Sequence, residues 1–142
     1  MKHYKKGYTQ GVYDMFHIGH LNLIRGAKAC CDELVVGVNA NILVESYKHK
    51  TPVVDETCRR EIVANIKGVD EAMIVHTLDK VELLKIIGFD AIFIGDDWRG
   101  TERWVQTERA LAEYGVDVVY LPYTKGVSST QLRLEFENAV QG

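Results

Sequence analysis

Short runs of apolar residues alternate along the chain with longer stretches in which apolar positions recur every three or four residues. The short runs are typical of buried strands, and the longer stretches are typical of helices that cover them. The run LVVGV at residues 34–38 is apolar throughout, as expected for a strand that is buried on both faces of a sheet. The pattern therefore predicts an α/β fold: an open, largely parallel sheet with helices on both faces.

Five strands are expected, at residues 8–13, 33–39, 71–75, 91–94 and 116–121. Helices are expected at residues 18–29, from about 56 to 66, 80–87 and 101–114, and a last helix follows Ser128 as its cap. Asp55 or Thr57 is expected to cap the second helix, while Gly88 and Gly115 follow the third and fourth, as glycine often does where a helix ends. Residues 40–55 break this rhythm and are predicted to form a loop or a broken helix.

Length and composition indicate one ordinary globular domain over residues 1–142, with 46% hydrophobic and 26% charged residues. The net charge of −3 disfavours a nucleic-acid binder, which is usually basic. No apolar run approaches the ~18 residues of a membrane span, and no secretory signal opens the chain. We therefore expect a cytoplasmic protein that binds neither nucleic acid nor membrane.

Three cysteines, Cys30, Cys31 and Cys58, are present, an odd number in which two are neighbours. Their spacing to histidines does not match a zinc site, so free thiols in a reducing compartment are expected and no protein-bound metal. A catalytic cysteine is the alternative, but no motif near these positions supports it.

Polar and glycine residues gather where three of the expected strands end, at residues 14–20, 95–100 and 123–130. In open α/β sheets, ligands bind beyond the carboxyl ends of the strands, where the strand order reverses. We therefore expect the three segments to line one crevice.

The first segment contains His17-Ile18-Gly19-His20, placed between an expected strand and an expected helix. Two imidazoles three residues apart lie on one face of a helix, and Gly19 allows a ligand to approach the backbone. Free N–H groups at the helix start favour anions, so the segment predicts a triphosphate site. A metal site and two purely structural histidines are the alternatives.

The sequence resembles a known family in three motifs. GVYDMFHIGH at residues 11–20 resembles the first signature of the cytidylyltransferases within the HxGH nucleotidylyltransferase superfamily, and GVSST at 126–130 resembles their second. GDDW at 95–98 matches a segment of the glycerol-3-phosphate cytidylyltransferases. The resemblance implies a Rossmann-like five-stranded sheet of order 3-2-1-4-5, a homodimer, and Mg²⁺ carried by the nucleotide. The implied reaction joins CTP to a small alcohol phosphate, glycerol 3-phosphate above all, and gives CDP-glycerol and pyrophosphate.

The resemblance also implies roles for individual residues. His17 and His20 would hold the triphosphate, Asp14 would orient the site, and Lys48, with Lys50 as a second candidate, would close over the phosphates from a mobile loop. A solvated charge run is the alternative for these lysines. Lys67 and Asp70 would lie near the dimer interface and the active site. Thr124, Ser128 and Ser129 would bind phosphates, and Asp97 and Trp98 would lie near the base and ribose. The remaining expected binding residues are Gly11, Tyr13, Gly19 and Gly126.

Three positions depart from the family pattern. Tyr123 replaces the arginine that opens the second signature, Lys67 replaces another arginine, and Ser129 replaces a threonine. The loss of a guanidinium at position 123 removes a bidentate phosphate donor. Arg99, Arg103 or Lys125 are the candidates to supply the missing charge.

Two other functions fit the same motifs. An adenylyltransferase of the ADP-heptose-forming type, which uses ATP, shares the HxGH motif and a G-x-S-T-T ending, although GDDW favours CTP. A nucleotide-sensing domain without turnover is the third possibility, and Tyr123 is the departure that motivates it.

Overall fold

The computed structural model describes residues 2–124, 134, 137 and 138. A sheet of five parallel strands in the order β3-β2-β1-β4-β5 lies at its centre, which confirms both the expected fold and the expected strand order. The strands are β1 (Tyr4–Gly11), β2 (Cys31–Asn39), β3 (Glu71–Val75), β4 (Ala91–Gly95) and β5 (Asp117–Leu121). The helices are α1 (Ile18–Ala29), α2 (Asn41–Lys48), α3 (Glu56–Ala64), α4 (Lys80–Ile87), α5 (Glu102–Ala112) and the short 3₁₀ helix η1 (Asp96–Trp98).

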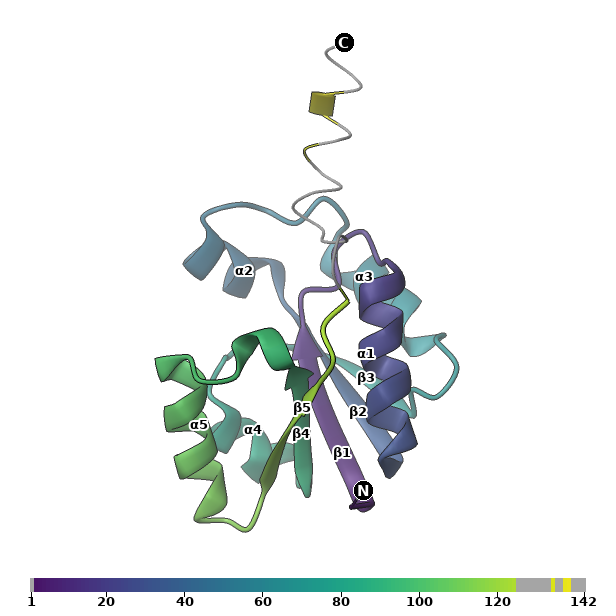
Figure 1. Ribbon diagram of the computed structural model, residues 1–142. Coiled ribbons are helices and arrows are strands. Elements are labelled where there is room, and N and C mark those ends of the chain that lie inside the picture. The colour runs from purple at the N-terminus through teal and green to yellow at the C-terminus, as the bar shows by residue number, and fades with distance from the viewer. Residues whose placement is uncertain (1, 125–133, 135–136, 139–142) are drawn as a thin grey trace.

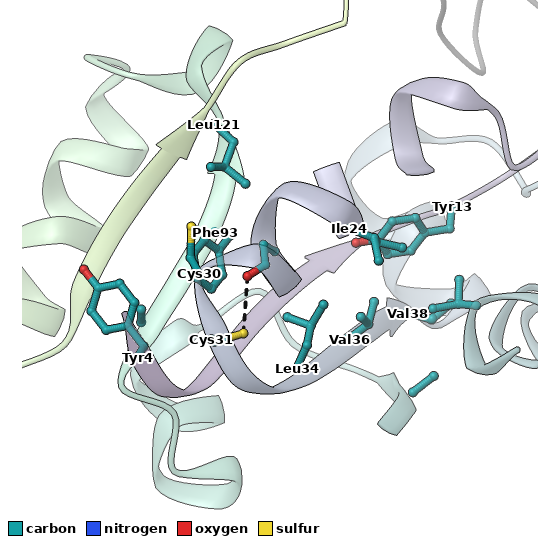
Figure 2. Close-up of a cluster of buried hydrophobic side chains, with 14 residues drawn as sticks. Tyr4, Tyr13, Ile24, Cys30, Cys31, Leu34, Val36, Val38, Phe93 and Leu121 are labelled. Atoms are coloured by element: carbon teal, nitrogen blue, oxygen red, sulfur yellow. Dashed lines mark hydrogen bonds between the residues drawn. The ribbon is translucent and has the colours of Figure 1, made fainter. Parts of the chain in front are cut away.

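Helices cover both faces of the sheet (Figure 1). Helices α1 and α3 lie against one face, and α4 and α5 lie against the other. Alternate residues of β2 serve the two layers: Leu34 and Val36 pack with Ile24 of α1 (Figure 2), whereas Val35 packs with Leu83 of α4. The continuous apolar run in β2 is therefore explained by burial on both of its faces.

The first strand differs from its prediction at both ends. It begins at Tyr4, whose N–H donates to the Cys30 carbonyl at 2.8 Å, and it ends at Gly11 rather than at Tyr13. The backbone of Tyr13 has a φ of 55°, a left-handed conformation that a strand cannot contain. The first half of the strand contains the polar residues Lys5 and Lys6, so a search for apolar runs does not find it. Lys5 is exposed to solvent.

Residues 40–55 form a regular helix followed by a loop. Helix α2 ends at Lys48, and His49 closes it in the left-handed conformation with a φ of 56°. The helix is only eight residues long and buries only Val44, so it offers few buried positions by which to recognise it. Smaller differences are that α3 ends at Ala64, that Asp55 rather than Thr57 is its cap, and that α5 is shorter by three residues than expected.

Three further elements and two helix-ending glycines agree with their predictions. Residues 18–29, 71–75 and 80–87 form the predicted elements, and Gly88 and Gly115 adopt the expected positive φ of 75° and 74°. All three cysteines are free, as predicted. The last helix, with its cap Ser128, falls almost wholly outside the described residues. Within the part of the chain that the structure describes, no helix combines the length and apolarity needed to cross a bilayer.

The strand order reverses beside β1, because β2 pairs with one edge of it and β4 with the other. The chain leaves β1 toward α1 on one face and enters β4 from α4 on the other. Beyond the carboxyl ends of β1 and β4 the connecting segments diverge, which leaves the crevice where ligands bind in such folds.

One buried arginine holds the segments around this crevice together. The side chain of Arg59, in α3, is 1% exposed. Its guanidinium donates to the carbonyls of Val54, Val12 and Asn39 at 2.7–2.8 Å and to the Asn41 side chain at 2.7 Å. These acceptors belong to the loop before α3, the end of β1, the end of β2 and the start of α2. Arg59 therefore fixes four chain segments relative to one another.

Replacement of Arg59 by methionine is predicted to lower the free energy of unfolding by about 3 kcal/mol or more, because three carbonyls would lose their donor. Arg60→Met is the matched control: the neighbouring guanidinium is partly exposed and donates to one carbonyl, that of Ala72. Urea unfolding followed by circular dichroism measures both variants. Equal losses of stability in the two variants would contradict the role assigned to Arg59.

Candidate functional site

A cleft of about 390 Å³ opens at the carboxyl ends of β1 and β4. Segments from the ends of β1, β4 and β5, from the start of α1, and from the end of α2 with its following loop line it. It brings together the sequence-predicted residues Gly11, Tyr13, Asp14, His17, Gly19, His20, Lys48, Asp97, Trp98 and Thr124. The expectation that the three strand ends meet in one crevice is thus confirmed for the described residues.

Two predicted site residues lie elsewhere. The Asp70 carboxylate accepts from Lys28 Nζ and from the Leu34 N–H, both at 2.8 Å, and Lys67 is exposed to solvent. Neither residue lines the cleft. Asp70 immediately precedes β3 and bonds to the first half of β2, so it lies toward the opposite end of the sheet. Neither residue approaches the cleft within this chain, and their expected place near a dimer interface and the active site stays a prediction.

Of the second signature, only its first part falls within the described residues. Gly126, Ser128 and Ser129, like Lys125, lie outside them. Thr124 is described, and its Oγ1 accepts from Asn22 Nδ2 at 3.1 Å, which ties the end of the β5 segment to α1.

Arg99 and Arg103 do not supply the charge that Tyr123 lacks. The Arg99 guanidinium stacks over the Tyr120 ring at 4.5 Å from its centroid, and neither arginine lines the cleft. Among the residues that the structure describes, the cations of the cleft are Lys48 and Lys50.

His17 and His20 lie at the start of α1 with their rings stacked. The ring centroids are 3.8 Å apart and the planes are inclined by 23°. His17 is the N-cap of the helix: its Nδ1 accepts from the Gly19 N–H at 3.1 Å. His20 in turn accepts at Nδ1 from the His17 N–H at 3.2 Å. The histidines therefore form a reciprocal cap, in which each side chain satisfies a backbone donor of the first turn.

This cap changes the sequence-based interpretation of the helix start. We expected free backbone N–H groups there to bind an anion, but the N–H groups of His17 and Gly19 are already used by the two imidazoles. These two amides are therefore not free to bind an anion as the helix start stands.

Burial keeps the pair neutral. Burial lowers the pKa of His17, and it is the main reason why the pKa of His20 is lowered to about 4. The Lys48 ammonium, and a proton on His17 when it is present, also lower the pKa of His20, whereas the Asp14 carboxylate raises it. The His20 ring also contacts the rings of Tyr13 and Phe16, with centroids 5.3 and 5.2 Å away. At neutral pH both imidazoles are therefore uncharged hydrogen-bond donors.

Asp14 is buried and fixes the loop that precedes α3. Its two carboxylate oxygens accept from the N–H groups of Val53 and Val54, each at 2.8 Å. Asp14 also lies near the Arg59 guanidinium. Asp14 was expected to orient the site, and its carboxylate anchors the loop that carries Lys50, Thr51 and Pro52 along the cleft.

Two residues beside Asp14 have a strained backbone. Tyr13 and Met15 have φ values of 55° and 49°. Non-glycine residues in this region cost free energy, and such strain gathers at functional sites. The strained turn directs Asp14 inward and carries the chain from β1 into the histidine cap.

Lys48 occupies the last position of α2 and does not belong to a loop, so the expectation of a mobile-loop lysine is wrong on that point. Its side chain is exposed and lines the cleft, as does Lys50. Buried Val44, one helical turn earlier, anchors the end of α2.

Aromatic side chains form another part of the cleft lining. Trp98 is 41% exposed and Tyr123 is 46% exposed, and both line the cleft. The Tyr123 N–H donates to the Asp96 carboxylate at 3.1 Å, which joins the segment after β5 to η1. Burial raises the pKa of the neighbouring Asp97, helped by the charge of Asp96. Half-exposed rings of this kind suit a planar base or a sugar ring.

Sequence reasoning missed the residues that hold the cleft together. Arg59 lies four positions before Val63, which is buried on the same face of α3. An arginine on an apolar helical stripe was the available signal. Gln10, whose amide donates to Asn39 and to the Thr77 carbonyl, and Asn22 carried no comparable signal.

Several curated relatives carry the name bifunctional protein HldE. The chain is 35% identical over 129 residues to the HldE of Caulobacter sp. (strain K31) and 34% identical over 127 residues to the HldE of Nitrobacter hamburgensis. These matches cover 90% and 89% of the chain. The chain spans about a quarter of the length of these relatives, 26% in both cases.

Solved structures share the fold at lower identity. The lipopolysaccharide core biosynthesis protein from Thermoplasma volcanium superposes with a TM-score of 0.71 at 24% identity, over 87% of this chain and 99% of that one. The pantothenate synthetase from Thermus thermophilus superposes with a TM-score of 0.69 at 18% identity, over 96% and 64%. At these identities the likeness concerns the fold alone.

A family model described as cytidylyltransferase-like matches residues 8–135, nearly the whole chain, including all three motifs. The fold, the strand order and the placement of the HxGH histidines at the cleft agree with that match. The chain belongs to the cytidylyltransferase-like family within the nucleotidyltransferase superfamily.

Proposed function

We propose that this chain transfers a nucleotidyl group from a nucleoside triphosphate to a phosphorylated alcohol or sugar. The reciprocal cap of His17 and His20 at the cleft carries the proposal, because it presents two neutral donors side by side where a phosphate chain would lie. The lysines at the end of α2 and in the loop after it lie along the same cleft.

The proposed reaction requires no covalent intermediate. A phosphate oxygen of the acceptor forms a bond to the α-phosphorus of the nucleotide, and the bond from that phosphorus to the bridging oxygen breaks. The electron pair leaves with pyrophosphate. Catalysis then consists of alignment and of stabilising the charge that grows on the phosphoryl oxygens, which is the work of hydrogen-bond donors and cations.

The charge balance of the cleft supports a divalent cation as a further component. The described lining contains Lys48 and Lys50 as cations and Asp14 and Asp97 as acids, while both imidazoles are neutral. A triphosphate would therefore find little net positive charge there. No cluster of three potential metal ligands is present among the described residues, so we propose that Mg²⁺ arrives bound to the nucleotide phosphates.

For the substrates, the ADP-heptose-forming type that uses ATP is better supported than the glycerol-3-phosphate cytidylyltransferase. The curated relatives named bifunctional protein HldE favour the former. The GDDW segment resembles that of the glycerol-3-phosphate cytidylyltransferases and so favours the latter, and its Asp97 and Trp98 line the cleft. We therefore place ATP with a sugar phosphate first and CTP with glycerol 3-phosphate second. We also propose that the chain forms a homodimer and that it is cytoplasmic.

A screen of pyrophosphate release tests the proposal. ATP and CTP are each combined with a heptose 1-phosphate, other sugar 1-phosphates and glycerol 3-phosphate, in the presence of Mg²⁺. We expect turnover with ATP and a sugar phosphate, and loss of turnover when a chelator removes the cation. His17→Ala should lower the rate by about 10²–10³, the usual cost of one donor to a transition-state oxyanion.

His76→Ala is the matched control, because His76 is exposed and does not line the cleft. Clear preference for CTP with glycerol 3-phosphate would reverse the order of the two substrate pairs. Binding of nucleotide without turnover on any acceptor would favour the nucleotide-sensing alternative. Near wild-type activity of His17→Ala would refute the assignment of the cleft.

Tyr123 offers a test of how the acceptor is held. Its ring lines the cleft at the position where the family has an arginine. Tyr123→Arg is predicted to lower the KM for the acceptor about tenfold, because a guanidinium adds a charge-assisted phosphate contact. Steady-state kinetics at saturating nucleotide measures the change.

Tyr114→Arg is the control for the added charge, because Tyr114 is 52% exposed beyond α5 and does not line the cleft. The same acceptor KM in wild type and Tyr123→Arg would show that position 123 does not meet the acceptor phosphate.

A further inference from the structure

Each imidazole of the histidine pair uses the same ring atom to bind the backbone. The Gly19 N–H donates to Nδ1 of His17 at 3.1 Å, and the His17 N–H donates to Nδ1 of His20 at 3.2 Å. A backbone N–H can only donate, so each Nδ1 must offer its lone pair and carry no proton. In a neutral imidazole the single proton then lies on Nε2.

We propose that the α1 backbone locks both histidines in the tautomer that carries its proton on Nε2, and that Gly19 is the positioning residue that makes the lock possible. Both rings then present an Nε2–H donor on the edge opposite the backbone. The inference rests on the proposed function for the identity of the anion that these donors bind.

The space around Gly19 shows why a side chain there would displace the His17 ring. A Cβ at this position would lie 2.9 Å from Cε1 and 3.0 Å from Nδ1 of the His17 ring. Both distances are at or below the limit that real Cβ atoms observe, so alanine would force the ring away from the Gly19 N–H. The absent side chain of Gly19 thus makes room for the enzyme's own imidazole, in addition to any room it leaves for a ligand.

The surroundings of the pair keep the rings neutral, which the lock requires. The groups that face them are the rings of Tyr13 and Phe16, the Asp14 carboxylate and the Lys48 ammonium. Burial lowers the pKa of both rings, and two protonated rings 3.8 Å apart would repel each other. A proton added at either Nδ1 would also break a cap bond of α1.

Neutral donors have a consequence for the chemistry. The histidines direct hydrogen bonds at phosphate oxygens but add no charge of their own, so among the described residues Lys48 and Lys50 supply the positive charge, together with the cation on the nucleotide. Both donors are already oriented before the substrate arrives, because the helix backbone holds each ring from behind. Preorganised donors of this kind stabilise a transition state without reorganisation during the reaction.

Nuclear magnetic resonance tests the lock in the wild-type chain without any assay of turnover. Long-range ¹H–¹⁵N correlation spectra of ¹⁵N-histidine-labelled protein at neutral pH distinguish protonated from unprotonated ring nitrogens. His17→Ala and His20→Ala spectra assign the signals. We expect both rings as neutral Nε2–H tautomers. A neutral Nδ1–H tautomer or a charged ring at either position would overturn the proposal.

Gly19→Ala tests the positioning role, with Gly26→Ala as the matched control in the same helix, where a Cβ would meet the Leu121 side chain. Thermal melts verify that both variants fold. We expect Gly19→Ala to bind the Mg²⁺ complexes of ATP and CTP about tenfold more weakly, the equivalent of one lost hydrogen bond, and to shift the His17 signals away from the pure Nε2–H pattern. Gly26→Ala should change neither.

The outcomes separate this proposal from the proposed function. Weaker nucleotide binding with an unchanged His17 spectrum would mean that Gly19 acts on the ligand directly, and would overturn the positioning role. Unchanged binding with an unchanged spectrum would overturn it as well. Failure of the turnover screen with the expected tautomers in place would refute the proposed function and leave the lock intact.

Discussion

The buried guanidinium of Arg59 and the loop-anchoring carboxylate of Asp14, which lies near it, together determine the geometry of the cleft. Arg59 holds the ends of β1 and β2, the start of α2 and the loop before α3 through four hydrogen bonds. Asp14 holds the same loop through the Val53 and Val54 amides. A buried charge is costly unless it is fully paired, so this arrangement tolerates few alternatives. These hydrogen bonds fix where the end of α2 with its following loop and the turn between β1 and α1 lie relative to each other.

The histidine cap depends on that constraint because it begins directly after the strained turn. Tyr13 and Met15 are held in left-handed conformations on either side of Asp14, and α1 starts three residues after Met15. The packed core beneath, where Ile24 of α1 meets Leu34 and Val36 of β2 (Figure 2), keeps the helix in place. Strain at the turn, burial of the charges and rigid packing together present two oriented neutral donors at the mouth of a parallel sheet.

The sequence predicted the elements that have a strong period, and the motifs that follow them. The buried run at 34–38, the helix at 18–29 and the clustering of three strand ends all follow from hydrophobic pattern and topology. Helix α2 was predicted only as a loop or a broken helix, because it is short and buries one residue. The role of Arg59 was missed, because its place on an apolar helical face signals burial but not which acceptors the guanidinium meets. The position of Asp70 could not be predicted from its motif, because a motif does not specify which end of the sheet it reaches in one chain; here Lys28 and the Leu34 amide bind it.

We propose that the cleft beyond β1 and β4 receives a nucleoside triphosphate. Backbone amide shifts in ¹H–¹⁵N spectra, mapped as the Mg²⁺ complex of ATP or CTP is added, test this binding site without an assay of turnover. We expect the shifts to concentrate at residues 11–20, 48–54, 95–98 and 122–124, while Asp70 and Asp117, toward the other end of the sheet, stay unchanged. Shifts centred on Asp70 and the amino-terminal strand ends, with the histidine turn unaffected, would contradict it.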